Sequence, residues 1–147
     1  MEINDFSIGQ LAKLAHTNVQ TIRFYEHKQL LDIPLRTEAG QRRYNVDSLN
    51  KLKFIRHGRE MGFCLDDIKE LLLLSSTRGQ TCEQIDAIAN AHLLRINSRI
   101  KRLQSLQTEL SRMIKSCQHG EVANCRVIEV LDDHKHCGKD HGEIEKI

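Results

Sequence analysis

The stretch SIGQLAKLAHTNVQTIRFYE, residues 7–26, carries two helix-start patterns in close succession. The first, Ser7-Ile8-Gly9-Gln10, is a capping box that opens a short helix through Leu14. The second, Thr17-Asn18-Val19-Gln20, opens a helix that runs through Glu26. Two short helices joined by about four residues are typical of a helix-turn-helix, whose second helix can enter the major groove of DNA, although an ordinary helical hairpin has the same pattern.

Residues 30–44 predict a small β-wing next to this pair of helices. Gly40 supplies a turn between two short extended pieces. Basic side chains beside such a turn can reach DNA phosphates, which positions a reading helix without specifying the base sequence. The candidate DNA contacts are therefore Gln20, Thr21, Arg23 and Tyr25 on the second helix and Arg36, Arg42, Arg43 and Tyr44 on the wing.

The chain behind the wing continues in helices. Asn45 or Asp47 can cap a helix that ends at Gly62, and residues 65–74 form another short helix. Residues 8–62 contain ten Lys and Arg against five Asp and Glu, whereas the formal net charge of the whole chain is only +2. A basic front on a nearly neutral chain favours nucleic acid as a partner.

Six short motifs follow one another between residues 6 and 74. They are Ile8-Gly9-x-Leu11-Ala12, Thr21-Ile22-Arg23-Phe24-Tyr25-Glu26, Leu30-Leu31, Gly40-x-Arg42-x-Tyr44, Phe54-Ile55 and Met61-Gly62-Phe63-x-Leu65-x-x-Ile68. This part of the chain resembles the MerR family of transcription regulators, with Gln29 and Gln41 in place of a usual glycine and a usual aromatic residue. The resemblance implies a homodimer that binds a palindromic promoter and activates transcription by RNA polymerase by distorting an overlong promoter spacer.

The segment from Cys82 to Cys117 predicts a long coiled-coil helix. It has neither Pro nor Gly, and apolar or thiol side chains recur at alternating spacings of three and four, with His92 and Arg99 as the polar exceptions. Such a helix has about five heptads, is roughly 52 Å long, and needs a second copy to cover its apolar seam. An antiparallel pair would bring Cys82 of one chain to Cys117 of the other. The seam comprises positions 82, 85, 89, 92, 96, 99, 103, 106, 110, 113 and 117.

Cys117 and Cys125 enclose a short loop, and residues 126–131 form an amphipathic element that can cover it. The loop can bring two thiols together, as a chelate for a soft metal ion requires, although most cysteine pairs at this spacing are incidental. By resemblance it is the effector loop of metal-sensing family members. In those relatives, copper and gold sensors have a serine at the position of Cys82, whereas sensors of divalent ions have a cysteine.

The thiols also indicate which ion is bound. Thiolates of Cys117, Cys125 and the partner's Cys82 favour a soft divalent ion such as Cd(II), Pb(II) or Hg(II), whereas Zn(II) usually takes a fourth ligand. The resemblance favours Cd(II) or Pb(II), because related zinc sensors have two adjacent cysteines where this chain has Ser116 and Cys117. The related mercury sensors have a loop one residue longer. Zn(II) is the next candidate, with His119 as the fourth ligand.

The sequence thus predicts a regulator that activates a metal efflux or resistance promoter when it binds a soft divalent ion. A zinc-responsive regulator of the same family is one alternative. A regulator switched by a disulfide between Cys117 and Cys125 is another.

The tail of residues 132–147 is polar, with three Lys against five Asp and Glu, which is typical of a disordered segment. The resemblance suggests an accessory metal site instead, because cadmium-responsive relatives place one histidine on the helix and others in the tail. Its ligands would be His92, His134, His136 and His141. Cys137 lies in the same tail, and Cys64 is expected to pack within the front domain.

The whole chain of 147 residues, with 39% hydrophobic and 4% aromatic residues, predicts a mainly α-helical protein. Its parts are a winged helix-turn-helix domain (1–76), an antiparallel coiled-coil dimerisation helix (81–117), a metal-binding loop with a short lid helix (117–131), and the tail (132–147). No apolar run approaches the roughly 20 residues of a membrane span and no signal peptide is recognised, which predicts a cytoplasmic protein. Five cysteines favour metal binding or reactive thiols over a disulfide framework. The sequence has no constellation typical of an enzyme.

Overall fold

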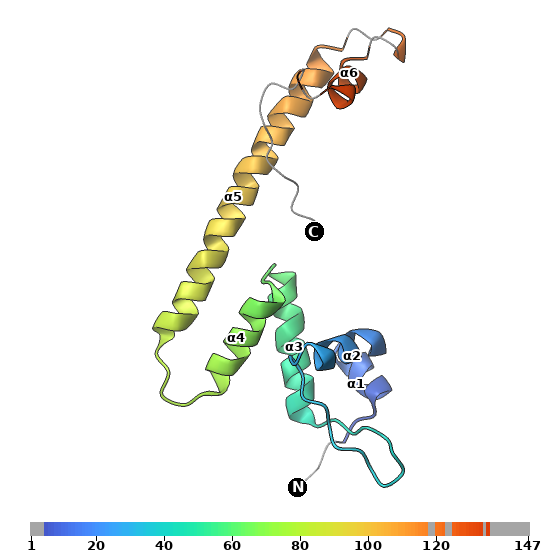
Figure 1. Ribbon diagram of the computed structural model, residues 1–147, viewed down its shortest axis with the longest axis vertical. Helices are drawn as coiled ribbons and strands as arrows, with labels where there is room; N and C mark the ends of the chain where they lie inside the picture. Colours follow the sequence, from blue (N-terminus) through green and yellow to red (C-terminus); the bar gives the residue numbers. More distant parts are fainter. Residues whose placement is uncertain (1–4, 118–119, 123–124, 134, 136–147) are drawn as a thin grey trace. The chain divides into compact units, whose positions relative to one another are not determined.

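The computed structural model describes residues 5–117, 120–122, 125–133 and 135. Its helices within these ranges are α1 (Ile8–Leu14), α2 (Val19–His27), α3 (Val46–Glu60), α4 (Leu65–Ser76), α5 (Cys82–Lys115) and α6 (Arg126–Asp132) (Figure 1). The prediction of a mainly helical protein is confirmed. None of these helices is long and apolar enough to cross a membrane.

The two helix starts of the opening stretch differ in their caps. The capping box at Ser7 is confirmed, since its side chain accepts from the Gln10 amide while the Gln10 side chain accepts from the Ser7 amide. The second box at Thr17 is wrong. Asn18 caps α2 instead and accepts from the amide of Thr21 at 2.7 Å, because the amide of Thr17 is already bonded to the carbonyl of Ala12 and closes the turn.

Asn45, and not Asp47, caps α3, with its side chain accepting from the amide of Ser48 at 2.9 Å. The helix ends where Gly62 adopts a φ of +85°, a conformation that residues with a Cβ rarely adopt. The next helix, α4, runs two residues further than the predicted range 65–74. Together these caps set the lengths of the two helices behind the wing.

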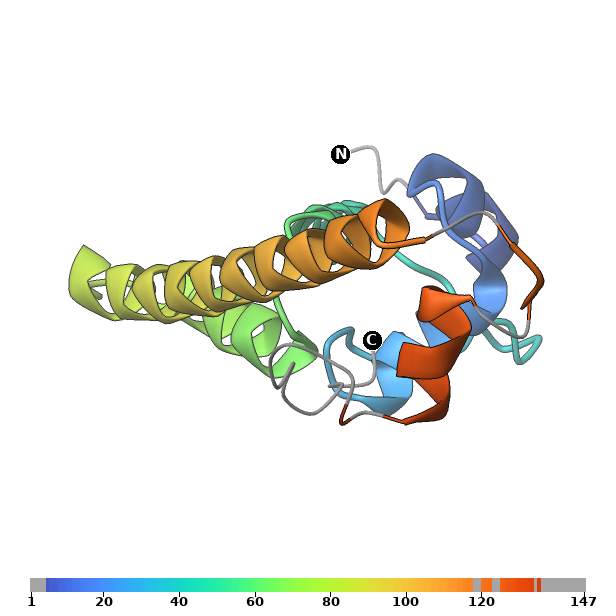
Figure 2. The same ribbon diagram turned by 90° about the horizontal axis from the view of Figure 1, so that it is seen from above.

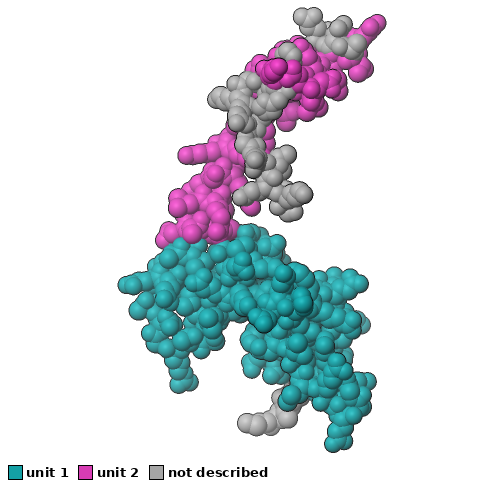
Figure 3. All heavy atoms as spheres, in the orientation of Figure 1, with its two compact units in different colours: residues 1–88 teal, residues 89–147 magenta. Residues whose placement is uncertain are grey.

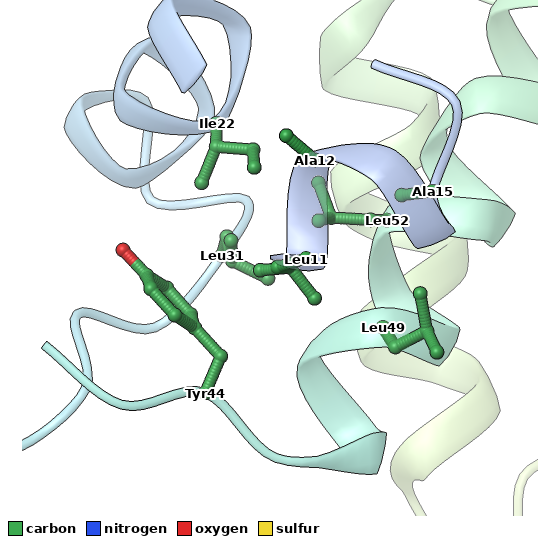
Figure 4. Close-up of a cluster of buried hydrophobic side chains, with 8 residues drawn as sticks. All are labelled: Leu11, Ala12, Ala15, Ile22, Leu31, Tyr44, Leu49 and Leu52. Atoms are coloured by element: carbon green, nitrogen blue, oxygen red, sulfur yellow. The ribbon is translucent and has the colours of Figure 1, made fainter. Parts of the chain in front are cut away.

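One apolar cluster holds α1, α2, the wing and α3 together (Figure 4). Leu11 and Ile22 have no exposed surface, and burial of a large aliphatic side chain contributes about 1.5–3 kcal/mol. The cluster consists of Leu11, Ala12, Ala15, Ile22, Leu31, Tyr44, Leu49 and Leu52. It fixes the inner face of α2 and leaves the outer face of that helix to the solvent.

A second cluster, formed by Leu30, Ile55 and Ile68, joins α3 to α4. A Cβ built on Gly58 would lie 2.9 Å from a side-chain carbon of Ile68. The absence of a side chain at Gly58 therefore lets these two helices approach closely.

The wing is less regular than predicted. Its two extended pieces are joined by an isolated antiparallel bridge between Arg36 and Arg42 in place of regular strands. A second isolated bridge, between Tyr44 and Phe6, ties the end of the wing to the segment before α1. Gly40 has a φ of +78°, as its predicted turn requires. Short, exposed strand pairs are only marginally stable. Leu35, which is 92% exposed, illustrates how little of this loop is packed.

The long helix α5 is continuous over 34 residues (Figures 1 and 2). It begins at Cys82 as predicted and ends at Lys115, so Cys117 lies just beyond it instead of within it. The amide of Cys117 still bonds to the carbonyl of Ile114 at 3.2 Å. Packing divides the chain into two compact units, residues 1–88 and 89–147, with the division inside α5 (Figure 3).

Candidate DNA-binding surface and metal-binding thiols

The outer face of α2 presents polar side chains near the beginning of the helix. Gln20 and Arg23 are exposed and Thr21 is half-buried, while Ile22 between them is fully buried in the core. An open groove of about 760 Å³ runs between α2 and the wing. Three arginines from these two elements, Arg23, Arg36 and Arg42, line it. The arrangement places cationic groups around an open groove, which favours contact with a polyanion.

The wing arginines differ in their surroundings. Arg36 is exposed, and Arg43 is 40% exposed and pairs with Asp5 at 3.6 Å. Arg42 is held more firmly, since its Nη1 donates to the Glu26 carboxylate at 2.8 Å. Only Arg42 of these three is thus tied to α2 by a hydrogen bond between the described residues.

Two of the predicted DNA contacts are turned toward the interior. Tyr44 is 1% exposed, and its hydroxyl donates to the other carboxylate oxygen of Glu26 at 2.6 Å. Burial, followed by the hydrogen bond and the charge of Glu26, raises the pKa of Tyr44 to about 12. Tyr44 is therefore a core residue instead of a phosphate contact, and its ring lies against the apolar cluster (Figure 4). Tyr25 is half-buried and packs against both clusters.

Glu26 was not among the predicted site residues. It is only 5% exposed, near the end of α2, and it accepts from both Arg42 and Tyr44. The sequence contains one indication of its role: Glu26 is the single acidic residue of a helix expected to face DNA. A carboxylate at such a place is unfavourable unless it is buried and paired.

Cys117 and Cys125 come together beyond the end of α5. Both are half-buried, and Cys125 immediately precedes α6. The backbone N–H groups of Ile128 and Val127, and then a hydrogen bond with the Cys117 side chain, lower the pKa of Cys125. Metal ions bind the thiolate form of cysteine. Two adjacent thiols, of which Cys125 has a lowered pKa, therefore suit a soft metal ion.

Cys82 lies at the opposite end of α5 and is exposed. Cys82 and Cys117 are about 35 residues apart along the helix axis, and at about 1.5 Å per residue this corresponds to roughly 52 Å. Within the residues that the structure describes, no three His, Cys, Asp or Glu side chains gather as a metal site. A single chain thus brings together two of the three predicted thiol ligands.

The remaining candidate ligands divide into three groups. His92 lies on α5 and is 7% exposed. His119, His134, His136 and His141, together with Cys137, lie outside the described residues. Cys64 does not pack as expected: it is exposed and caps α4, with its sulfur accepting from the amide of Asp67 at 3.4 Å.

The predicted seam of α5 is only partly open. Leu103 is 65% and Leu110 is 52% exposed, and both lie on the seam. His92 and Met113, which were also placed on it, are buried within the chain. The free apolar surface therefore follows part of the seam.

Two family models match the chain. One, described as "MerR HTH family regulatory protein", matches residues 6–75, and another, described as "MerR, DNA binding", matches residues 49–113. The transcriptional regulator ZntR of Escherichia coli K12 is 39% identical over 131 residues, which cover 86% of this chain and 92% of that protein.

Two solved structures with bound metal are similar as well. The regulator PbrR691 from Ralstonia metallidurans CH34 in complex with lead(II) is 35% identical, with a TM-score of 0.77, and the match covers 86% of this chain and 98% of that one. MerR from Bacillus megaterium MB1 in complex with mercury(II) is 27% identical, with a TM-score of 0.66, over 86% of this chain and 99% of that one.

Proposed function

Because the chain belongs to the MerR family of transcription regulators, we propose that it is a metal-sensing activator of a metal efflux or resistance promoter. The observation that carries this proposal is the pair of adjacent thiols, Cys117 and Cys125, with a lowered pKa at Cys125. The relatives are transcription regulators, which agrees with a role outside enzyme catalysis.

The proposed assembly is a two-fold dimer of antiparallel α5 helices. The exposed Leu103 and Leu110 provide apolar surface for a second copy. The partner's Cys82 then completes the set of ligands with Cys117 and Cys125, which no single chain can do over the length of α5.

The proposed ion is Cd(II) or Pb(II). Three thiolates are a soft donor set, and the similar PbrR691 structure contains lead(II). Zn(II) is the second candidate, since it is bound tetrahedrally and His119 would supply a fourth ligand. In either case the bound ion would join the loop after α5 in one subunit to the beginning of α5 in the other.

Metal specificity is tested with a reporter gene under the protein's own promoter. We expect Cd(II) or Pb(II) to induce it at lower concentrations than Zn(II), Hg(II) or Cu(I). Cys125→Ser should abolish induction, whereas Cys64→Ser should retain it, because serine also caps a helix and Cys64 belongs to the compact unit that does not contain the thiol pair. Induction by Zn(II) alone would replace the proposed ion with the second candidate.

The same thiol pair also allows a redox switch. Two adjacent thiols, one of them with a lowered pKa, are the arrangement that forms a disulfide readily. Diamide without metal distinguishes the two mechanisms. A metal sensor should give no induction, whereas induction by diamide alone would favour the redox regulator.

Replacement of Arg23 by alanine should remove promoter binding and spare metal binding. Arg23 is exposed on the outer face of α2 and lines the groove beside the wing. A base contact is worth about 1–3 kcal/mol and a two-fold dimer would lose it twice, so promoter affinity should fall by about a hundredfold or more. Fluorescence anisotropy and metal titration of the same preparation measure both properties. Equal loss of both would contradict the separation of the two sites.

A further inference from the structure

We propose that Glu26 is a positioning residue that holds the wing arginine Arg42 in place for contact with a DNA phosphate. The inference rests on the proposed DNA-binding role of the wing and adds the group that orients it. Glu26 itself would not touch DNA.

The geometry is that of a buried clamp between α2 and the wing. One oxygen of the Glu26 carboxylate accepts from Arg42 Nη1 at 2.8 Å and the other accepts from the Tyr44 hydroxyl at 2.6 Å. Tyr44 is fully packed in the core and its backbone is bridged to Phe6. The carboxylate is thus anchored on one side by a rigid group and presents a fixed negative charge to Arg42 on the other.

Arg42 can serve both partners at once. Its guanidinium carries five N–H donors in a planar fork. Glu26 engages Nη1 and the Tyr44 hydroxyl is a second neighbour of the group, so further donors remain for another acceptor. The side chain is 29% exposed and lines the groove between α2 and the wing. A phosphate in that groove would meet a guanidinium whose orientation is already set, which lowers the entropic cost of binding.

The wing needs such a clamp because the hydrogen bonds of its tip, from Thr37 to Gln41 and from Gly40 to Thr37, stay within the wing and do not hold it against α2. The two bridges of its backbone are isolated, and its tip is exposed. The hydrogen bond from Arg42 to Glu26 lies next to the Arg36–Arg42 bridge and ties this part of the wing to the helix that would read bases. The register between phosphate contacts and base contacts would therefore depend on Glu26.

Glu26→Gln tests the proposal, because glutamine keeps the volume and can still accept from Tyr44 but removes the charge that holds Arg42. Removal of a negative charge near DNA would by itself strengthen binding. The clamp predicts the opposite, a loss of promoter affinity on the order of tenfold. It also predicts a smaller salt dependence, by about 0.9 in the slope of log K against log salt for each phosphate that the protein no longer neutralises.

Two further variants make the result specific. Glu38→Gln removes the same charge from an exposed residue of the wing and should leave the salt slope unchanged. Arg42→Ala should lower affinity across different DNA sequences and reduce the slope, and addition of Glu26→Gln to it should change the slope no further. Thermal unfolding measures the folded fraction of each variant. A lower folded fraction reduces the concentration of active protein but does not change the slope of log K against log salt.

The outcomes separate the clamp from the DNA contact on which it rests. A reduced slope in Arg42→Ala with an unchanged slope in Glu26→Gln would overturn the role of Glu26 alone. An unchanged slope in Arg42→Ala, or a change in base preference without loss of affinity, would overturn the phosphate contact as well.

Discussion

The double variant Ile96→Glu/Leu103→Glu is expected to be a monomer under conditions in which the wild-type protein is a dimer without metal. Leu103 is 65% exposed and Ile96 is half-buried in the single chain, so both keep apolar surface that a partner can cover. The proposed antiparallel register pairs residue i with about residue 199 − i, which places Ile96 against the partner's Leu103. Sedimentation equilibrium measures the mass directly.

The expected effect is large because the two-fold axis repeats each change. A buried leucine or isoleucine contributes about 1.5–3 kcal/mol, and four such side chains would be replaced by carboxylates that face each other. Since every 1.4 kcal/mol is tenfold, the dimer should weaken by at least about a thousandfold. An unchanged dimer would contradict the assigned seam.

A matched control and a rescue test the register itself. Leu94→Glu changes a leucine that is 70% exposed and lies outside the seam, so it should leave the dimer intact. Ile96→Glu/Leu103→Lys should recover association at low salt, because the register sets opposite charges against each other across the axis. A parallel pair would place like charges together at both positions and would stay dissociated.

A mixture of Cys82→Ser and Cys117→Ser subunits is expected to recover one high-affinity Cd(II) site per heterodimer, whereas each single variant has none. In the heterodimer one junction has an intact Cys82 facing an intact Cys117, and the other junction has both serines. A site built within one chain could not be recovered in this way, because each chain keeps its own defect. The wild-type dimer should bind two ions.

The heterodimer is purified with two different tags and titrated with Cd(II). Cys64→Ser subunits, mixed and purified in the same way, should keep both sites. Cys82→Ser alone should shift the preference toward Cu(I), which two thiolates bind in a linear arrangement. A heterodimer without any high-affinity site would contradict the shared, antiparallel site.

Local patterns in the sequence determined the helices of the front domain. The capping side chains of Ser7 and Asn45 lie within three residues of the amides they satisfy. The start of each helix therefore depends on a few neighbouring residues. The uninterrupted helix from Cys82 follows in the same way from the absence of Pro and Gly. The Cys117 and Cys125 spacing indicated that the two thiols could meet, because only a short loop separates them.

Contacts between distant residues were decided only in the tertiary structure. Glu26 meets Tyr44 and Arg42 across 18 and 16 positions of sequence, and no local pattern states which side chain turns inward. The sequence therefore predicts a DNA contact for Tyr44, which instead completes the core, and it does not predict Glu26 as a site residue. The physical reason is that burial and pairing of a polar group depend on which elements pack together, whereas a helix cap depends on residues three positions away.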